Sequence, residues 1–434
     1  MKRVALHNLG CKVNAYETEA MGQLLKDAGY VLVPFDAGAD IYIINTCTVT
    51  NIADRKSRQM LHRAKKMNPE AVVVAAGCYV QTAGDHIWED GSVDLVIGNN
   101  KKKDLISILE DYDKGRKAEA LIDINHTKEY ESLFVTEQTE HTRAYVKVQD
   151  GCNQFCSYCI IPYARGRVRS RAEKDIRSEA EKLAQGGCRE VVLTGIHLSS
   201  YGVDMEGADL LSLIRMVQEI PGIRRIRLGS LEPRIITEEF AKALGEADKL
   251  CPHFHLSLQS GCDGVLKRMN RRYTTAEYEK ACELLRSVFD DPALTTDVIV
   301  GFPGETDEEF CETEAFLKKI AFFQTHIFKY SRRKGTKAAD MAGQLREAVK
   351  AERSRRLLEL NEIFERQYLE RQTGRQTEIL VEEFVEISGI SYQTGHTREY
   401  CRAVFVSDTD LTGQIVYAVG EKVLENGLLL CKLL

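Results

Sequence analysis

Apolar and polar positions follow two different periods along the first 125 residues. Short apolar runs at 4–9, 41–45, 71–77, 93–98 and 121–124 have the length of buried strands. Residues 15–28 and 52–66 instead carry apolar positions at helical spacing, and Gly29 follows the first of these helices as a stop signal. Strands that alternate with helices predict βαβ units and a parallel, Rossmann-like sheet for residues 1–124.

A second α/β series follows a polar, weakly periodic stretch at 125–141, which we interpret as a linker. Six strands are predicted at 144–149, 191–195, 223–230, 254–259, 294–302 and 323–330. Helical patterns separate them at 173–186, 208–219, 275–288 and 307–321, and a long charged helix at 346–372 closes the series. Six βα units fit an incomplete barrel at least as well as an open sheet.

The pattern changes again from about residue 373. Five short alternating strands in about sixty residues, separated by turn residues, predict a small OB-like β-barrel. The expected fold is therefore an α/β multidomain protein with an N-terminal domain at 1–124, a linker at 125–141, a partial (βα)6 barrel at 142–370 and a small β-barrel at 371–434.

Composition agrees with an ordinary globular protein, since 44% of the 434 residues are hydrophobic and 29% are charged. No apolar run has the length to span a bilayer, and the apolar stretch at the N-terminus is too short for a signal peptide. We therefore expect a cytoplasmic protein without a membrane partner. The net charge of −6 gives no global attraction to nucleic acid, although local basic groups occur at 165–171, 271–272, 332–334 and 353–356. Most such charge runs are simply solvated faces.

Thirteen cysteines are unusual for such a chain. Disulfides are not expected in the cytoplasm, so clustered cysteines favour metal binding or catalysis. Seven of them lack ligand spacing and are interpreted as small buried hydrophobes: Cys188, Cys251, Cys262, Cys282, Cys311, Cys401 and Cys431.

Three cysteines form a compact motif within 148-VQDGCNQFCSYCIIPYARGR-167, namely Cys152, Cys156 and Cys159. A structural zinc site is closed and takes four ligands, and no fourth cysteine follows nearby. An iron–sulfur cluster suits thiolates better. Because a cubane has four irons, three thiolates leave one iron free to bind a substrate. The missing fourth ligand therefore favours an iron–sulfur cluster with one open iron over a zinc site.

The N-terminal region repeats the pattern without a compact motif. Cys11, Cys47 and Cys78 each follow a predicted strand directly. The carboxyl ends of parallel strands share one edge of a sheet, where ligands bind. The three thiols are therefore expected to converge as a second three-thiolate site; the alternative is three separate buried thiols.

The motif C-x-x-x-C-x-x-C at a strand-to-helix turn that opens a (βα) barrel resembles the radical S-adenosylmethionine superfamily. In that superfamily the open iron chelates the amino and carboxylate groups of the methionine moiety. The resemblance implies S-adenosylmethionine contacts at the strand ends and beside the third cysteine: Tyr158, Thr194, Gly195, Gln259 and Asp297.

Two three-cysteine sites followed by a small β-barrel are similar, over essentially the whole chain, to the tRNA methylthiotransferases, whose C-terminal barrel is of the RNA-binding TRAM type. The segments NLGCKVNAYETE (8–19), CSYCIIPYARGRVRSR (156–171) and LTGIHLSSYG (193–202) resemble the branch that acts on N6-threonylcarbamoyladenosine.

The resemblance implies two [4Fe-4S] clusters and S-adenosylmethionine. The cluster on Cys152, Cys156 and Cys159 would cleave S-adenosylmethionine reductively, and the resulting radical would start attack at C2 of an adenosine next to the anticodon. The cluster on Cys11, Cys47 and Cys78 would present sulfur, and a second S-adenosylmethionine would supply the methyl group. No side chain is expected to act as acid or base.

Partners follow from the same resemblance. They are the anticodon loop of tRNA and an external one-electron donor of the flavodoxin or ferredoxin type. Phosphates of the RNA would be held by the C-terminal barrel and by five basic residues: Arg165, Arg167, Arg332, Arg333 and Lys334.

Two alternatives remain at this stage. One is the same chemistry on another modified adenosine or on a ribosomal protein side chain, which the roughly balanced to acidic C-terminal segment leaves open. The other is a non-catalytic, zinc-stabilised RNA-binding protein.

Overall fold

The computed structural model describes residues 1–36, 38–116, 120–136 and 142–434. Its first unit is a parallel five-stranded sheet in the order β2-β1-β3-β4-β5. Apolar cores lie on both faces of this sheet. The strands are β1 (Arg3–Asn8), β2 (Val31–Leu32), β3 (Ile41–Thr46), β4 (Val72–Gly77) and β5 (Leu95–Ile97), and the helices are α1 (Lys12–Asp27), α2 (Asn51–Met67), α3 (Cys78–Ala83) and α4 (Leu105–Asp113).

Two expectations for this region were wrong. The predicted strand at 121–124 is not a strand. Ile122 O accepts a hydrogen bond from Gln81 Nε2 of α3, and the preceding Ala120 O accepts one from Gly98 N, just after β5. Of the apolar residues in this segment, Ile124 is buried, and Leu121 and Ile122 are half-buried. The two-residue edge strand β2 was missed because it is too short to show a period.

The described part of the expected linker, 125–136, carries no helix or strand, and residues 137–141 lie outside the described residues.

The second unit is an incomplete barrel, which decides between the two architectures that the sequence allowed. A sheet β7-β6-β8-β9 and a sheet β10-β11-β12 are joined by isolated bridges such as Leu231 to Leu256. All six predicted strands are present and parallel, with the short antiparallel β7 added at one edge. The strands are β6 (Ala144–Asp150), β7 (Arg169–Ser170), β8 (Glu190–Gly195), β9 (Arg225–Leu228), β10 (His253–His255), β11 (Ala293–Val300) and β12 (Gln324–Lys329).

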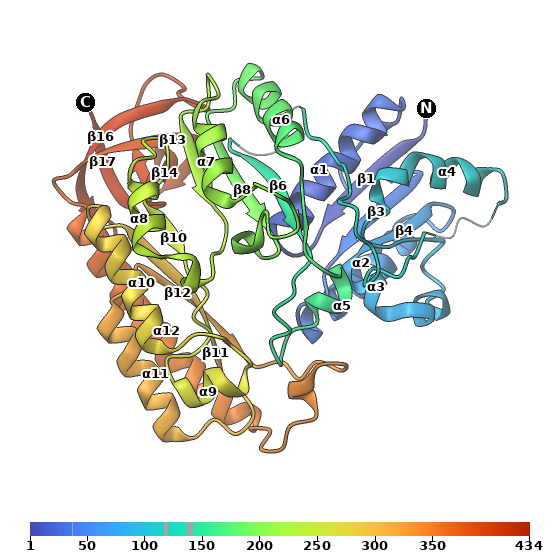
Figure 1. Ribbon diagram of the computed structural model, residues 1–434. Coiled ribbons are helices and arrows are strands. Elements are labelled where there is room, and N and C mark those ends of the chain that lie inside the picture. Colours follow the sequence, from blue (N-terminus) through green and yellow to red (C-terminus); the bar gives the residue numbers. More distant parts are fainter. Residues whose placement is uncertain (37, 117–119, 137–141) are drawn as a thin grey trace.

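Helices cover the outer face of these strands (Figure 1). Capping boxes fix where three of them begin: Asp209 with Ser212, Thr274 with Glu277, and Thr306 with Glu309. The helices are α5 (Ile161–Arg165), α6 (Glu173–Gln185), α7 (Leu210–Gln218), α8 (Glu238–Gly245), α9 (Asp263–Arg268), α10 (Thr275–Val288), α11 (Asp307–Ile320) and α12 (Glu347–Arg371). Within the described ranges, no helix is both long enough and apolar enough to cross a membrane.

The C-terminal unit is a closed five-stranded barrel in the order β13-β14-β15-β17-β16. Its core includes Tyr368 and Leu369 of α12, so the barrel is docked on that helix. Likewise, Tyr16 and Ala20 of α1 belong to the core of the incomplete barrel. The strands are β13 (Gln376–Ile387), β14 (Ile390–Thr397), β15 (Arg402–Phe405), β16 (Ile415–Val423) and β17 (Leu429–Leu433). Shared cores therefore join the three units.

Candidate functional site

The three N-terminal cysteines follow the strands β1, β3 and β4, which are neighbours in the sheet. Gly10, with φ of +111°, lies so close to Cys47 that an added Cβ would stand 3.0 Å from its Sγ atom. Burial, followed by the nearby Cys78 and Cys11, raises the pKa of Cys47 to about 11. The structure thus brings these thiols together at the carboxyl edge of the sheet.

The barrel cysteines lie in the loop after β6. Gly151, with φ of +72°, allows this loop to fold tightly, because an added Cβ would stand 1.8 Å from the Arg167 carbonyl oxygen. A turn then closes from Cys159 N to Cys156 O at 2.9 Å. Burial and the neighbouring thiols raise the pKa of Cys152 to about 11 and that of Cys159 to about 12. Without a metal these thiols are therefore protonated, and metal binding would release protons.

The spacing of the sulfurs tests which metal group each triad fits. In a tetrahedral zinc site with Zn–S bonds of about 2.3 Å, the sulfurs lie roughly 3.8 Å apart. Of the described residues, neither cysteine triad brings its three Sγ atoms within 4.8 Å of one another. Thiolates that bind separate irons of a cubane need this wider spacing. Three thiolates at each site, with no fourth protein ligand proposed, suit a cluster with one open iron better than a closed four-ligand zinc site.

Groups around the sulfurs donate hydrogen bonds to them. Arg271 Nη1 donates to Cys156 Sγ at 3.2 Å, and the backbone N–H of Gln154 donates to Cys152 Sγ at 3.5 Å. Arg165 Nε donates to Cys78 Sγ at 3.2 Å, and Asn99 Nδ2 lies 3.5 Å from the same sulfur. Such contacts orient thiolate ligands and stabilise their charge. The sequence interpretation missed Arg271 as a sulfur partner, because it lies 115 residues from Cys156.

A fully buried ionic network stands behind the N-terminal triad. Arg165 donates to Glu17 Oε1 at 2.5 Å and to Asn14 Oδ1 at 2.6 Å. Lys147 and Lys102 also contact Glu17, at 2.7 and 3.1 Å. Burial opposes ionisation of Glu17, but these three cations hold its pKa well below the usual range.

This network corrects one prediction. Arg165 is fully buried, and its guanidinium donates hydrogen bonds to Glu17, Asn14 and Cys78. It has no surface with which to contact RNA. Arg169 and Arg171 of the same basic stretch are buried too, whereas Arg167 is exposed and lies over the Phe155 ring at 4.5 Å.

The basic group at 332–334 divides in the same way. Arg333 is buried and bonds Asp54 and Thr48, so it docks the loop after β12 onto the start of α2 and is not available to RNA. Arg332 and Lys334 are exposed.

The predicted S-adenosylmethionine contacts lie near the carboxyl ends of barrel strands or beside the cysteine loop. Thr194 and Gly195 end β8, and an added Cβ on Gly195 would stand 2.8 Å from Gln149 Oε1. Gln259 has φ of +73°, and its N–H donates to Asp297 O at 2.8 Å. Tyr158 is half-buried, and burial, followed by the neighbouring Cys156, raises its pKa well above the usual value.

Sequence reasoning also missed a group of three ionisable side chains inside the barrel. One ligand atom each of His255, Asp297 and His326 lies within 4.8 Å of the others. The three residues lie on the separate strands β10, β11 and β12, so no local sequence pattern marks the group.

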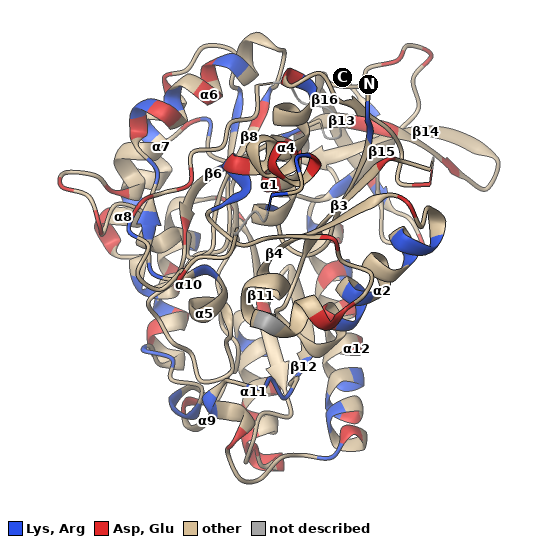
Figure 2. Ribbon diagram, turned by 90° about the vertical axis from the view of Figure 1, so that its right-hand side faces the viewer, with Lys and Arg blue, Asp and Glu red and all other residues tan. Residues whose placement is uncertain are grey.

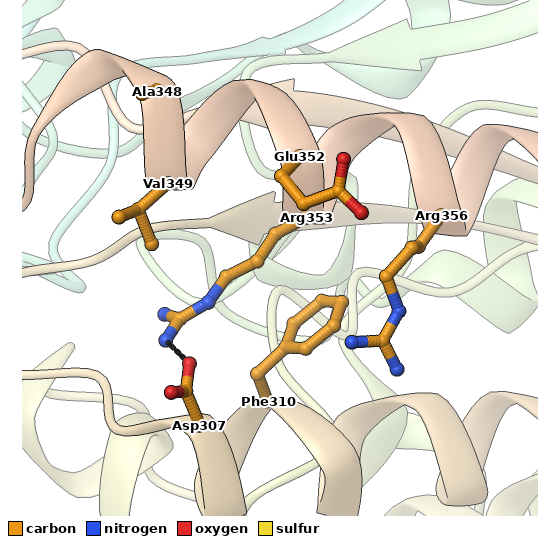
Figure 3. A pocket seen from close by; sticks show the side chains of 7 residues that line it. All are labelled: Asp307, Phe310, Ala348, Val349, Glu352, Arg353 and Arg356. Carbon is orange, nitrogen blue, oxygen red and sulfur yellow. Dashed lines mark hydrogen bonds and ion pairs between the residues drawn. The ribbon is translucent and has the colours of Figure 1, made fainter.

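Among the cysteines expected to be buried, Cys311 is exposed, because it lies on the outer side of α11; the other six are buried as expected. A surface groove between α11 and α12 lies on the same outer side (Figure 3). Its cations are paired, Arg353 with Glu305 and Asp307, and Arg356 with Glu314. This groove offers no free cation for an anionic ligand.

Comparison with known proteins is consistent with this geometry. Residues 146–317 match the Radical SAM superfamily, and residues 3–98 match a family described as Uncharacterized protein family UPF0004. The chain is 42% identical, over 96% of its length and 93% of the relative's, to "Threonylcarbamoyladenosine tRNA methylthiotransferase MtaB" of Bacillus subtilis. It is 35% identical, over 96% of its length and 88% of the relative's, to "tRNA-2-methylthio-N(6)-dimethylallyladenosine synthase" of Acetivibrio thermocellus.

Among solved structures, the radical S-adenosylmethionine methyltransferase TsrM from Kitasatospora setae, with cobalamin and a [4Fe-4S] cluster bound, is similar with a TM-score of 0.57. It covers 76% of this chain and 75% of its own at 17% identity. At that identity the likeness concerns the fold alone.

Proposed function

The chain belongs to the radical S-adenosylmethionine tRNA methylthiotransferase family, in its threonylcarbamoyladenosine branch, and from this premise we propose that it converts N6-threonylcarbamoyladenosine in tRNA into the 2-methylthio derivative. The observation that carries the proposal is the pair of three-cysteine sites. Cleavage of S-adenosylmethionine needs one open cluster, whereas this chain gathers a second set of thiols at the edge of a separate sheet.

Cys152, Cys156 and Cys159 would hold one [4Fe-4S] cluster together with S-adenosylmethionine, and Cys11, Cys47 and Cys78 would hold the other. When bound, the barrel cluster supplies the electron that cleaves S-adenosylmethionine, and the second cluster supplies sulfur. The protein itself binds, orients and excludes water.

Its own groups have three roles in this proposal. Arg271 and Arg165 donate hydrogen bonds to a sulfur of each triad and so stabilise the thiolate form. Tyr158, Thr194, Gly195, Gln259 and Asp297 line the S-adenosylmethionine site. The buried network of Glu17 with Arg165, Lys147 and Lys102 fixes α1, which begins directly after Cys11, against the barrel.

RNA contact falls to Arg167, Arg332 and Lys334, which are exposed, and to the C-terminal barrel, which we assign to the TRAM type with an OB-like fold. The segment 373–434 has nine acidic residues and five basic ones. Its binding to RNA therefore depends on particular residues and not on its net charge. Basic and acidic residues are also interspersed over the outer helices (Figure 2). Phosphate contacts of this kind position the loop next to the anticodon without reading its sequence.

The remaining parts of the proposal follow from the substrate. The domains are 1–124, 142–370 and 371–434, with 125–141 as linker. A flavodoxin- or ferredoxin-like protein supplies electrons. Because the substrate is tRNA, the cytoplasm is the favoured location of the protein.

The alternatives are less well supported. Three cysteines at each site, with no fourth ligand proposed, argue against a closed structural zinc site. Five relatives named for dimethylallyladenosine are 34–35% identical. Of three named for threonylcarbamoyladenosine, two are 42% identical and one is 35% identical.

The test is mass spectrometry of tRNA nucleosides from cells that lack the gene. We expect the 2-methylthio derivative to disappear and N6-threonylcarbamoyladenosine to accumulate. Unchanged nucleosides would contradict the proposed function.

A further inference from the structure

The short helix α5 carries an exposed tyrosine on a turn that is held firmly from behind. Arg165, in this turn, is fully buried and donates hydrogen bonds to Glu17. Ala164 O accepts a hydrogen bond from Asn99 Nδ2 at 2.7 Å. Tyr163 stands two residues before Arg165, which is about 200° around a helix, so it lies on the opposite side. With 44% of its surface exposed, Tyr163 presents an aromatic ring to solvent from a fixed backbone.

Two further side chains form a group with this tyrosine. The ring of Phe155 lies 5.9 Å from that of Tyr163, edge to face at 78°. The guanidinium of Arg167 lies over the Phe155 ring at 4.5 Å. Asn270 Nδ2 donates to Phe155 O at 2.9 Å and so holds the backbone below that ring. Phe155 is half-buried, whereas Tyr163 and Arg167 are exposed. We call Phe155, Tyr163 and Arg167 the aromatic patch.

The patch has positive charge that the protein leaves free. Within the described ranges, the side chains of Arg167 and Lys334 make no hydrogen bond or ion pair. Lys334 belongs to the same region, because a Cβ added to the next residue, Gly335, would stand 3.6 Å from Ile160 Cδ1. Ile160 O in turn accepts a hydrogen bond from Tyr163 N at 3.0 Å. Two exposed, unpaired cations beside an aromatic ring favour an anionic partner.

The patch lies between the two three-cysteine sites. Tyr163 follows Cys159 of the barrel triad by four residues. The loop after β12, which carries Lys334, is bound on its other side to the start of α2, where Asn51 Nδ2 donates to Arg332 O at 2.8 Å. Asn51 follows Cys47 of the N-terminal triad by four residues. The exposed groups therefore extend from one cysteine site towards the other.

This position decides between two anionic partners, RNA and an acidic electron-transfer protein. An electron donor has to reach only the barrel cluster. The adenosine that receives sulfur has to meet groups at both sites, so the RNA strand on either side of it passes over the surface between them. Proteins bind single-stranded RNA by stacking bases on aromatic side chains and by placing cations along the backbone. The ring of Tyr163 with the free cations of Arg167 and Lys334 matches that chemistry.

We infer that Tyr163 stacks on the base of a nucleotide that neighbours the modified adenosine, while Arg167 and Lys334 bind phosphates beside it. Phe155 supports the tyrosine through the edge-to-face contact of the two rings. The inference rests on the proposed function and adds a contact with a base to the phosphate contacts named there. Every base has a π-face, so this contact forms whichever base is present. The protein can therefore act on tRNAs that differ at the neighbouring position.

The test is a double-mutant cycle between protein and RNA, measured as the affinity of the cluster-loaded protein. The RNA is an anticodon stem-loop with N6-threonylcarbamoyladenosine, either intact or with an abasic nucleotide at each neighbouring position in turn. Tyr163→Ala should weaken binding of the intact RNA by about fivefold or more. The abasic RNA should lose the same factor with wild type and nothing further with Tyr163→Ala. Tyr163→Phe should bind as wild type, because stacking needs the ring and not the hydroxyl.

Controls separate a base contact from a structural role. Iron content is measured for each variant, and if Tyr163→Ala does not load iron, Tyr163→Leu keeps the apolar volume without the ring. Tyr417→Ala removes another exposed tyrosine, on β16 away from α5 (Figure 1), and should show no coupling to the neighbouring base. Arg167→Gln should lower the salt slope by about 0.7, again without coupling to the base.

Equal affinity of wild type for the intact RNA and both abasic RNAs would overturn the inference, and so would unchanged affinity in Tyr163→Ala. Slower reduction of Tyr163→Ala by a reduced flavodoxin, with RNA affinity unchanged, would assign the patch to the electron donor and overturn it as well. Failure of the wild-type protein to methylthiolate the intact RNA would instead contradict the proposed function.

Discussion

Arg165 donates a hydrogen bond from Nε to the Sγ atom of Cys78 at 3.2 Å, although 87 residues separate the two. The same guanidinium binds Glu17 and Asn14 of α1. One side chain of the barrel unit therefore connects a cysteine and a helix of the N-terminal unit.

Replacing Arg165 with glutamine should be strongly destabilising. It leaves Glu17 and Asp150 buried with fewer partners, and breaking a buried ion pair on one side costs about 3–5 kcal/mol. Arg167→Gln, two residues away and exposed, should change the free energy of unfolding by less than about 0.5 kcal/mol. Denaturant unfolding of both variants measures this. Equal stability of the two would contradict the role given to Arg165.

Metal content separates clusters from zinc. Anaerobically reconstituted protein should carry about eight irons per chain, and changing Cys152, Cys156 and Cys159 together to alanine should leave about four. Iron and sulfide analysis gives the result. One zinc per chain and no iron would exclude the cluster assignment.

Replacing the cysteines of the N-terminal site should abolish sulfur insertion and leave cleavage of S-adenosylmethionine at the other site intact. With Cys11, Cys47 and Cys78 replaced by alanine, the protein should still cleave S-adenosylmethionine to 5′-deoxyadenosine, because the barrel triad is intact, but sulfur insertion should stop. Chromatography of the small molecules and nucleoside mass spectrometry follow the two steps separately. Loss of cleavage with a fully loaded barrel cluster would show that the sites depend on each other.

Of the cations, only the exposed ones should contribute to RNA affinity. Changing Arg332 and Lys334 together to glutamine should lower the slope of log K against log salt by about 0.7–0.9 for each phosphate that the protein no longer neutralises. Arg333→Gln, between them, should leave the slope unchanged and instead loosen the loop from α2, because it is paired with Asp54. Titrations at several salt concentrations distinguish these outcomes, and an unchanged slope in the double variant would place the RNA elsewhere.

Acid should weaken the fold partly through Glu190. Burial opposes its ionisation, but Arg227, Arg143 and Arg225 lower its pKa to about 2. Because the folded pKa lies below the unfolded value of about 4.3, its contribution is complete above that value and is lost as pH falls towards 2. The free energy of unfolding should therefore fall more steeply between about pH 4.5 and 2 in wild type than in Glu190→Gln. Parallel slopes would contradict this.

Much of the fold could be predicted because strand and helix periods are local. The convergence of Cys11, Cys47 and Cys78 was also predictable, since each directly follows a parallel strand. Burial of Arg165 and Arg333 was not: whether an arginine is exposed depends on which surface later covers it, and their partners are 148 and 279 residues away. The contact of Arg271 with Cys156 escaped prediction for the same reason.

The buried position of Glu17 has a consequence for synthesis on the ribosome. Its partners Lys147 and Arg165 are made 130 and 148 residues later. The N-terminal sheet emerges first, as N-terminal parts generally do. The face of α1 with Tyr16, Glu17 and Ala20 therefore stays exposed to solvent until the barrel unit has been made. An N-terminal unit cut at residue 124 would keep that face exposed permanently. The hydrogen bond from Arg165 to Cys78 can likewise form only after the chain has been translated past Arg165.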